Sequence, residues 1–110
     1  MQFHECERLR IYTGEYDRID GISAHEFIVK AAHQTGLKGA TVFRASMGYG
    51  AHNEIHTARI LRMSEDLPII VEIVDEPGTI NTFCETVLVK LNKGLVTRET
   101  LLACSPAKHS

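Results

Sequence analysis

The segment from Leu67 to Asp75, LPIIVEIVD, constrains the fold more than any other part of the chain. It is almost continuously apolar and β-branched, and Glu72 interrupts the run. Such a run predicts a strand with both faces covered. Two helices can cover one face of a sheet, but in a chain of 110 residues the second face needs cover from other chains. The segment therefore predicts a sheet protein that forms oligomers.

Two helices are predicted, one before this strand and one after it. The first runs from Ser23 to Thr35, and Ser23 with Glu26 fits a capping box at its start. The second runs from Pro77 to Leu91, because Pro77 suits a first helical turn. Apolar residues then recur at the helical spacing without a break.

Three more strands complete the pattern. Leu9, Ile11 and Thr13 alternate with polar neighbours, which is typical of a half-buried strand. A second strand is expected from Ala40 to Met47, and a last one within residues 95–104. The order strand, helix, strand, strand, helix, strand predicts an α+β, ferredoxin-like (βαββαβ) fold. In this fold two helices lie on one face of an antiparallel four-stranded sheet.

Length and charge limit the remaining possibilities. We expect residues 1–110 to form a single domain, with 1–7 and 105–110 loose. The net charge of −2 gives no global field that would attract nucleic acid. The three cysteines are widely spaced, without CxxC, and predict neither a disulfide framework nor a zinc site. With no signal-like start and no apolar run of about 20 residues, a cytoplasmic location is predicted.

The stretch from Gly39 to His56, GATVFRASMGYGAHNEIH, is the predicted seat of function. It reads as a strand that runs into Gly48, Tyr49 and Gly50 and then turns back. Two glycines around an aromatic residue give a backbone that can turn sharply and approach a ligand closely. The nearby cations include Arg44, Lys93 and Arg98. Cations that converge with glycine amides would suit phosphate groups.

Catalysis is less well supported by the residues. His52, Glu54 and His56 are three potential metal ligands or proton carriers within five residues, and on a strand they would share one side. HNEIH differs from the zinc-protease motif HExxH, and a solvated polar loop is the favoured interpretation. Ser46 has no evident base beside it, so nucleophilic catalysis is unsupported. We therefore expect a protein that is not an enzyme.

Several motifs in order resemble a known family. GLKGATVFRASMGYG, then LPIIVEIVD, then KGLVTRETLL resemble the nitrogen-regulatory PII proteins, and resemble still more the PII-like proteins of unknown function. The resemblance covers about residues 8–104. It implies a homotrimer with a nucleotide, usually ATP or ADP, in each cleft between subunits. It also implies a loop that docks on a target protein such as a membrane transporter.

The resemblance assigns roles to particular residues. Gly48, Tyr49 and Gly50 match the loop base that touches the phosphates, Thr41 matches the threonine near the adenine, and Gly94 falls in the segment of the phosphate-binding turn. The chain departs from PII proteins at 97–100, where it reads TRET instead of glycine-aspartate-glycine-lysine, and it lacks their final arginine pair. The predicted ligand-binding residues are Thr41, Arg44, Gly48, Tyr49, Gly50, His56, Lys93, Gly94 and Arg98.

Three functions follow as expectations. The favoured one is a trimeric regulatory protein that senses an adenine nucleotide or another anionic metabolite and signals through the loop from Gly48 to His56. The second is a trimeric interaction module that needs no ligand, which the departures at 97–100 favour. The third is an enzyme or metal-binding protein that uses His52, Glu54 and His56.

Overall fold

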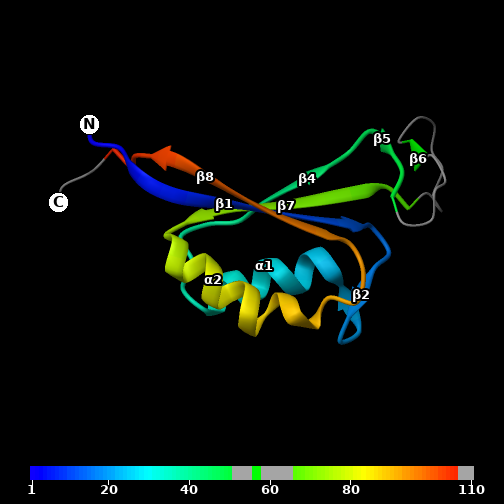
Figure 1. Ribbon diagram of the computed structural model, residues 1–110. Helices are drawn as coiled ribbons and strands as arrows, with labels where there is room; N and C mark the ends of the chain where they lie inside the picture. The colour runs from blue at the N-terminus through cyan, green and yellow to red at the C-terminus, as the bar shows by residue number, and fades with distance from the viewer. Residues whose placement is uncertain (51–55, 58–65, 107–110) are drawn as a thin grey trace.

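The fold is an antiparallel sheet with helices on one face (Figure 1). The computed structural model describes residues 1–50, 56–57 and 66–106. The main sheet has the strand order β4-β7-β1-β8. Its members are β1 (His4–Gly14), β4 (Thr41–Arg44), β7 (Pro68–Asp75) and β8 (Leu95–Ala103). This is the ferredoxin-like order, so the predicted fold class is confirmed.

The helices and the short strands complete the molecule. The helices α1 (Ala24–Gln34) and α2 (Pro77–Thr86) lie side by side against one face of the sheet (Figure 1). A 3-10 turn, η1 (Leu88–Lys90), follows α2. The short strands β2 (Arg18–Ile19) and β3 (Ile22–Ser23) pair with each other, as do β5 (Met47–Gly48) and β6 (His56–Thr57).

The core lies between the sheet and the two helices. Alternate residues of the two central strands point into it, which is the period-two pattern that the sequence predicts for β1. The helices add apolar side chains at the helical spacing. The fully buried members are Leu9, Ile11, Ile28, Ile69, Val71, Ile73 and Ile80.

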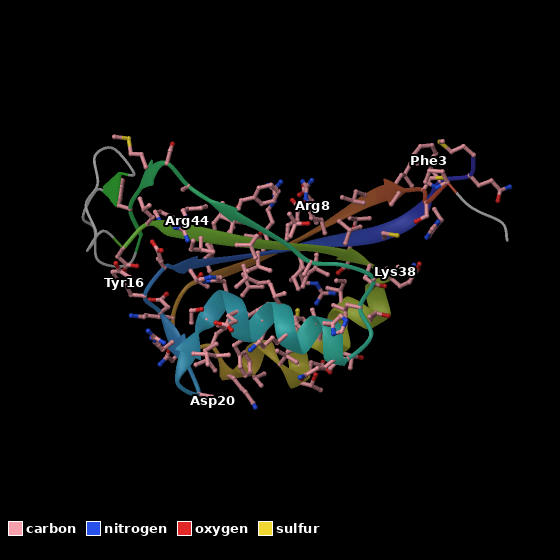
Figure 2. The ribbon with its side chains drawn as sticks, turned by 180° about the vertical axis from the view of Figure 1, so that it is seen from behind. Phe3, Arg8, Tyr16, Asp20, Lys38 and Arg44 are labelled. Carbon is pink, nitrogen blue, oxygen red and sulfur yellow. The ribbon has the colours of Figure 1, made fainter. Side chains whose placement is uncertain are left out.

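The other face of the sheet is only partly covered. Along β7, buried residues alternate with half-buried ones within the described residues, so one chain leaves the second face open, as the sequence predicts. Cover of that face by other chains stays a prediction. Phe43 is 47% exposed and Leu95 58% exposed on this open face. Arg10 Nε donates to Glu72 Oε2 at 2.8 Å there. Figure 2 shows Arg8 on the side of the sheet away from the helices.

Two predicted boundaries are wrong at the ends of the sheet strands. Residues 1–7 are not all loose, because β1 begins at His4, which pairs with Ala103 of the long strand β8. The predicted second strand, 40–47, is divided. β4 ends at Arg44, although Ala45 N still donates to Pro68 O at 2.9 Å before the chain leaves the sheet.

Two details of the helices also differ from the predictions. The Ser23 hydroxyl meets Glu26 Oε1 at 3.4 Å and makes no backbone cap bond, so the predicted capping box is not formed. The second helix ends at Thr86 rather than Leu91. Thr86 Oγ1 donates to Thr82 O at 2.8 Å, and such back-bonding weakens and bends a helix.

The cysteines are free thiols. Cys6 is buried, whereas Cys84 and Cys104 are half-buried, and Cys104 follows β8 instead of lying within a strand. Burial raises the pKa of the Cys6 and Cys84 thiols, so both keep their protons at neutral pH. None of the helices among the described residues is both long and apolar enough to span a membrane.

Candidate functional site

A cavity of about 380 Å³ opens at the end of the sheet where the β5–β6 hairpin lies (Figure 1). It is formed where β1 ends, at the base of the predicted functional loop, and at the turn before β8. The residues that line it are Tyr12, Thr13, Gly14, Asp17, Tyr49, Gly50, Asp66, Pro68, Lys93, Gly94 and Leu95.

Strand pairing brings these distant segments together. Tyr12 on β1 pairs with Leu95 on β8, and Gly14 pairs with Pro68 on β7. The turn before β8 therefore lies on one side of the end of β1, and the start of β7 lies on the other. A Cβ on Gly48 would lie 3.0 Å from Pro68 Cγ, so the loop base packs closely against β7.

Gly94 has a conformation that glycine alone adopts easily. Its φ is +105°, outside the regions favoured by L-residues. A Cβ at this position would lie 2.6 Å from Tyr12 O. The close approach of this turn to β1 therefore depends on the missing side chain.

Charged groups of both signs face the cavity. Lys93 Nζ lies 3.2 Å from Asp17 Oδ1, with 45% of the lysine side chain and 13% of the aspartate side chain exposed. Asp17 Oδ2 also accepts from Gly14 N at 2.8 Å, so this carboxylate is held at two points. Asp66 Oδ1 accepts from Tyr16 N at 2.9 Å. Within the described part of the chain, the cavity lining thus contains one lysine and two aspartate carboxylates.

Four of the predicted ligand-binding residues line the cavity: Tyr49, Gly50, Lys93 and Gly94. Tyr49 is 62% exposed, so a face of its ring is open to a ligand. Gly48 is not itself a lining residue but packs against Pro68, which lines the cavity. The backbone of His56 pairs with Gly48 in the β5–β6 hairpin, while its side chain lies outside the described residues.

Three predicted residues lie elsewhere. Thr41 and Arg44 are exposed on β4, and Arg44 Nη1 lies 3.1 Å from Glu15 Oε2. Arg98 lies within β8, where its Nε donates to Glu7 Oε1 at 2.9 Å and its Nη1 donates to Asn81 Oδ1 at 3.2 Å. The segment 97–100 is thus strand rather than the predicted turn, because β1 pairs with β8 along its whole length.

Two lining carboxylates were missed by the sequence reasoning. Asp17 and Asp66 are not among the predicted ligand-binding residues. The signal that could have found them is strand order. Asp17 closely follows the end of the first strand and Asp66 directly precedes the third, and neighbouring antiparallel strands bring those ends together. His52 and Glu54, the alternative metal ligands, lie outside the described residues.

Comparison with known families gives a clear match. A model of the DUF190 family, described as an uncharacterized ACR, matches residues 6–102. The chain belongs to the DUF190 family. A UPF0166 protein of Aquifex aeolicus (strain VF5) is 41% identical over 99 residues, which cover 90% of this chain and 93% of the relative. A UPF0166 protein of Methanocaldococcus jannaschii is 37% identical over 93 residues, covering 80% of this chain and 82% of the relative.

Solved structures place this DUF190 chain among PII-like folds. CPII of Thiomonas intermedia K12, a nitrogen regulatory PII-like protein bound to ADP, AMP and bicarbonate, matches with a TM-score of 0.69 and 16% identity, covering 96% of this chain and 93% of CPII. CPII bound to ADP and bicarbonate matches with a TM-score of 0.63 and 18% identity, covering 96% and 94%. The predicted resemblance to PII-like proteins of unknown function is confirmed.

Proposed function

We propose that this protein is a cytoplasmic regulator that binds an adenine nucleotide, or another small anionic metabolite, in the cavity at the base of the loop from Gly48 to His56. Binding changes the order of the loop, and the loop acts on a partner protein. The observation that carries this proposal is the convergence of Tyr49 and Gly50 with Lys93 and Gly94 around one cavity.

The chemistry of the cavity suits such a ligand. Ligand pockets are mostly apolar concavities of about 300–1,000 Å³ with a few polar groups. This cavity of about 380 Å³ offers the exposed ring of Tyr49, which can pack on a base. Gly50 allows a close approach, since a Cβ there would meet no atom of the described residues within 4 Å. Lys93 supplies a positive charge, and the CPII structures with bound ADP give a precedent in the same fold.

An anion at Lys93 would also alter a contact within the chain. Lys93 is paired with Asp17, which follows the end of β1, and a phosphate near Nζ competes with that carboxylate. Asp17 keeps its hydrogen bond from Gly14 N after the lysine is released. The Lys93–Asp17 pair is therefore the contact through which a bound anion would be sensed.

The proposal includes a homotrimer. The open sheet face carries Phe43 and Leu95, which are 47% and 58% exposed, and other copies of the chain would cover them. A neighbouring chain would then complete the cavity, which lies at one end of this sheet. Light scattering should give three times the chain mass, and a monomer at every concentration would contradict this part.

Thermal unfolding with a panel of nucleotides tests the function. A ligand at 100 times its Kd should raise the free energy of unfolding by about 2.7 kcal/mol, which gives a clear shift in Tm. We expect ATP, ADP or AMP to give such a shift. Lys93→Met should weaken the affinity for the nucleotide at least about tenfold, and so reduce the shift, since a charge-assisted contact contributes roughly 1.5–3 kcal/mol.

The matched control is Lys30→Met. Lys30 Nζ also forms one exposed ion pair, at 3.1 Å from Glu26 Oε2, but lies on α1 away from the cavity. It should leave the nucleotide shift unchanged. Equal losses in both variants, or no shift with any nucleotide or phosphate-bearing metabolite, would contradict the ligand part of the proposal.

A second function, an interaction module without a ligand, is favoured by one observation. Among the described residues that line the cavity, the carboxylates of Asp17 and Asp66 outnumber the lysine, Lys93, and this charge balance repels anions. This module would capture its partner equally with and without nucleotide, and would lose it when residues 51–55 are deleted. Nucleotide-dependent capture would exclude it.

A further inference from the structure

A second group of chemically active side chains lies at the opposite end of the sheet. His4, Cys6 and Glu76 each place one potential ligand atom within 4.8 Å of the other two. His4 Nε2 lies 3.1 Å from Glu76 Oε2. Cys6 is 3% exposed, whereas the side chains of His4 and Glu76 are 54% and 44% exposed. The thiol of the group is therefore buried, while its imidazole and carboxylate are accessible from solvent.

The fold itself brings these three residues together. His4 and Cys6 are two apart on β1 and therefore point to the same side of the strand. Glu7 pairs with Asp75, so the start of β1 lies beside the end of β7, and Glu76 comes next in the chain as the N-cap of α2. Figure 2 shows Phe3 and Lys38 at this end, while Arg44 and Tyr16 mark the end with the cavity.

We propose that His4, Cys6 and Glu76 form a binding site for a divalent transition metal ion of the zinc class. Imidazole nitrogen, thiolate sulfur and carboxylate oxygen are the donors that Zn²⁺ takes in proteins. The metal ion would displace the proton of the Cys6 thiol, which is released to water on binding. Its bond lengths imply donor separations of roughly 3.3–3.8 Å in a tetrahedral site. Because the three atoms already lie within 4.8 Å of one another, they need to approach by no more than about 1.5 Å to reach that geometry.

The surrounding contacts support the ligands. Asp75 is buried, and its Oδ1 accepts from Glu76 N at 2.7 Å while its Oδ2 accepts from Lys38 N at 2.9 Å. This carboxylate fixes the backbone that carries Glu76, as partners behind metal ligands commonly do. Three protein ligands leave the fourth tetrahedral position for water or another donor.

Lys38 pairs with one of the three proposed ligands. Its Nζ lies 3.4 Å from Glu76 Oε2, and 61% of its side chain is exposed. A metal ion on Glu76 would displace this ammonium group into water, which costs little for an exposed ion pair. The lysine is therefore a competitor for the site, and its removal should strengthen metal binding.

Cobalt binding gives a direct test, because Co²⁺ bound to a thiolate has a charge-transfer absorption in the near ultraviolet. Untagged protein is freed of metal with a chelator and titrated with Co²⁺ and then with Zn²⁺. We expect the absorption to saturate at one Co²⁺ per chain and to disappear when Zn²⁺ replaces it. Cys6→Ser should abolish it, and Glu76→Gln should weaken Co²⁺ binding.

Two further variants make the test specific. Cys84→Ser removes a half-buried thiol on α2, away from the site, and should leave the absorption unchanged. Lys38→Met should tighten Co²⁺ binding by roughly fivefold, because it removes a competing positive charge. An absorption that persists in Cys6→Ser, no saturable binding at all, or weaker binding in Lys38→Met would overturn the proposal. None of these readouts depends on nucleotide binding.

Discussion

At the scale of the residue, the turn before β8 depends on Gly94. The family resemblance places this residue in a phosphate-binding segment. The reason for glycine is visible only in three dimensions, because a Cβ would lie 2.6 Å from Tyr12 O and the φ is +105°. The role of Asp17 is also visible only in three dimensions. Its Oδ1 lies 3.2 Å from Nζ of Lys93, which is far away in the chain, and nothing in the local sequence indicates this contact.

We expect Gly94→Ala to destabilise the protein. The backbone conformation alone should cost about 1–3 kcal/mol, and the contact with Tyr12 O adds to this. Gly78→Ala is the matched control, because a Cβ at Gly78 in α2 would meet nothing within 4 Å in the part of the chain that the structure describes. That change should be neutral or stabilise by about 0.4–1 kcal/mol. Urea unfolding measures both, and equal effects of the two substitutions would contradict the role of Gly94.

At the scale of the element, the helices are positioned by different residues than their local sequence indicates. Ser23 is a favoured N-cap residue, yet its hydroxyl meets the Glu26 carboxylate rather than a backbone amide. The buried Asp75 instead accepts from two backbone amides, Lys38 N and Glu76 N. It thereby ties the connection after α1 to the start of α2, a tertiary role that no local pattern reveals.

Asp75→Ala should therefore lower the free energy of unfolding by about 1–3 kcal/mol or more, because it leaves buried donors without an acceptor. Ser23→Ala should cost less than about 0.5 kcal/mol, whereas a hydrogen-bonded cap would cost about 1 kcal/mol. Chemical unfolding of the two variants beside the parent protein gives both values. A larger loss in Ser23→Ala than in Asp75→Ala would show that the assignment of these two roles is wrong.

At the scale of the whole molecule, the fold class followed from the order of the elements, because the periods of apolar residues distinguish strands from helices. The almost continuous apolar run in β7 also indicated a second face that only other chains can cover, and one chain does leave that face open. The cavity could be predicted only in part. Tyr49 and Gly50 belong to a recognisable motif, whereas Arg98 lies within strand β8 and outside the lining of the cavity.

Two sites at opposite ends of one strand would let this small protein bind two different ligands, an anionic metabolite and a metal ion. The cavity lies where β1 ends at Gly14, and the His4–Cys6–Glu76 group lies where β1 begins. A strand of 11 residues separates its ends by roughly 33 Å, so the two ligands would not touch. Each site can therefore be tested without disturbing the other.

The most direct test of the central claim is a crystal structure of the protein grown with saturating ADP. We expect the nucleotide to lie in the cavity between Tyr49–Gly50 and Lys93–Gly94, with a phosphate at Lys93 Nζ in place of the Asp17 carboxylate. ADP bound at another surface, or crystals with an unaltered Lys93–Asp17 pair and an empty cavity, would contradict the claim that this cavity is the nucleotide sensor.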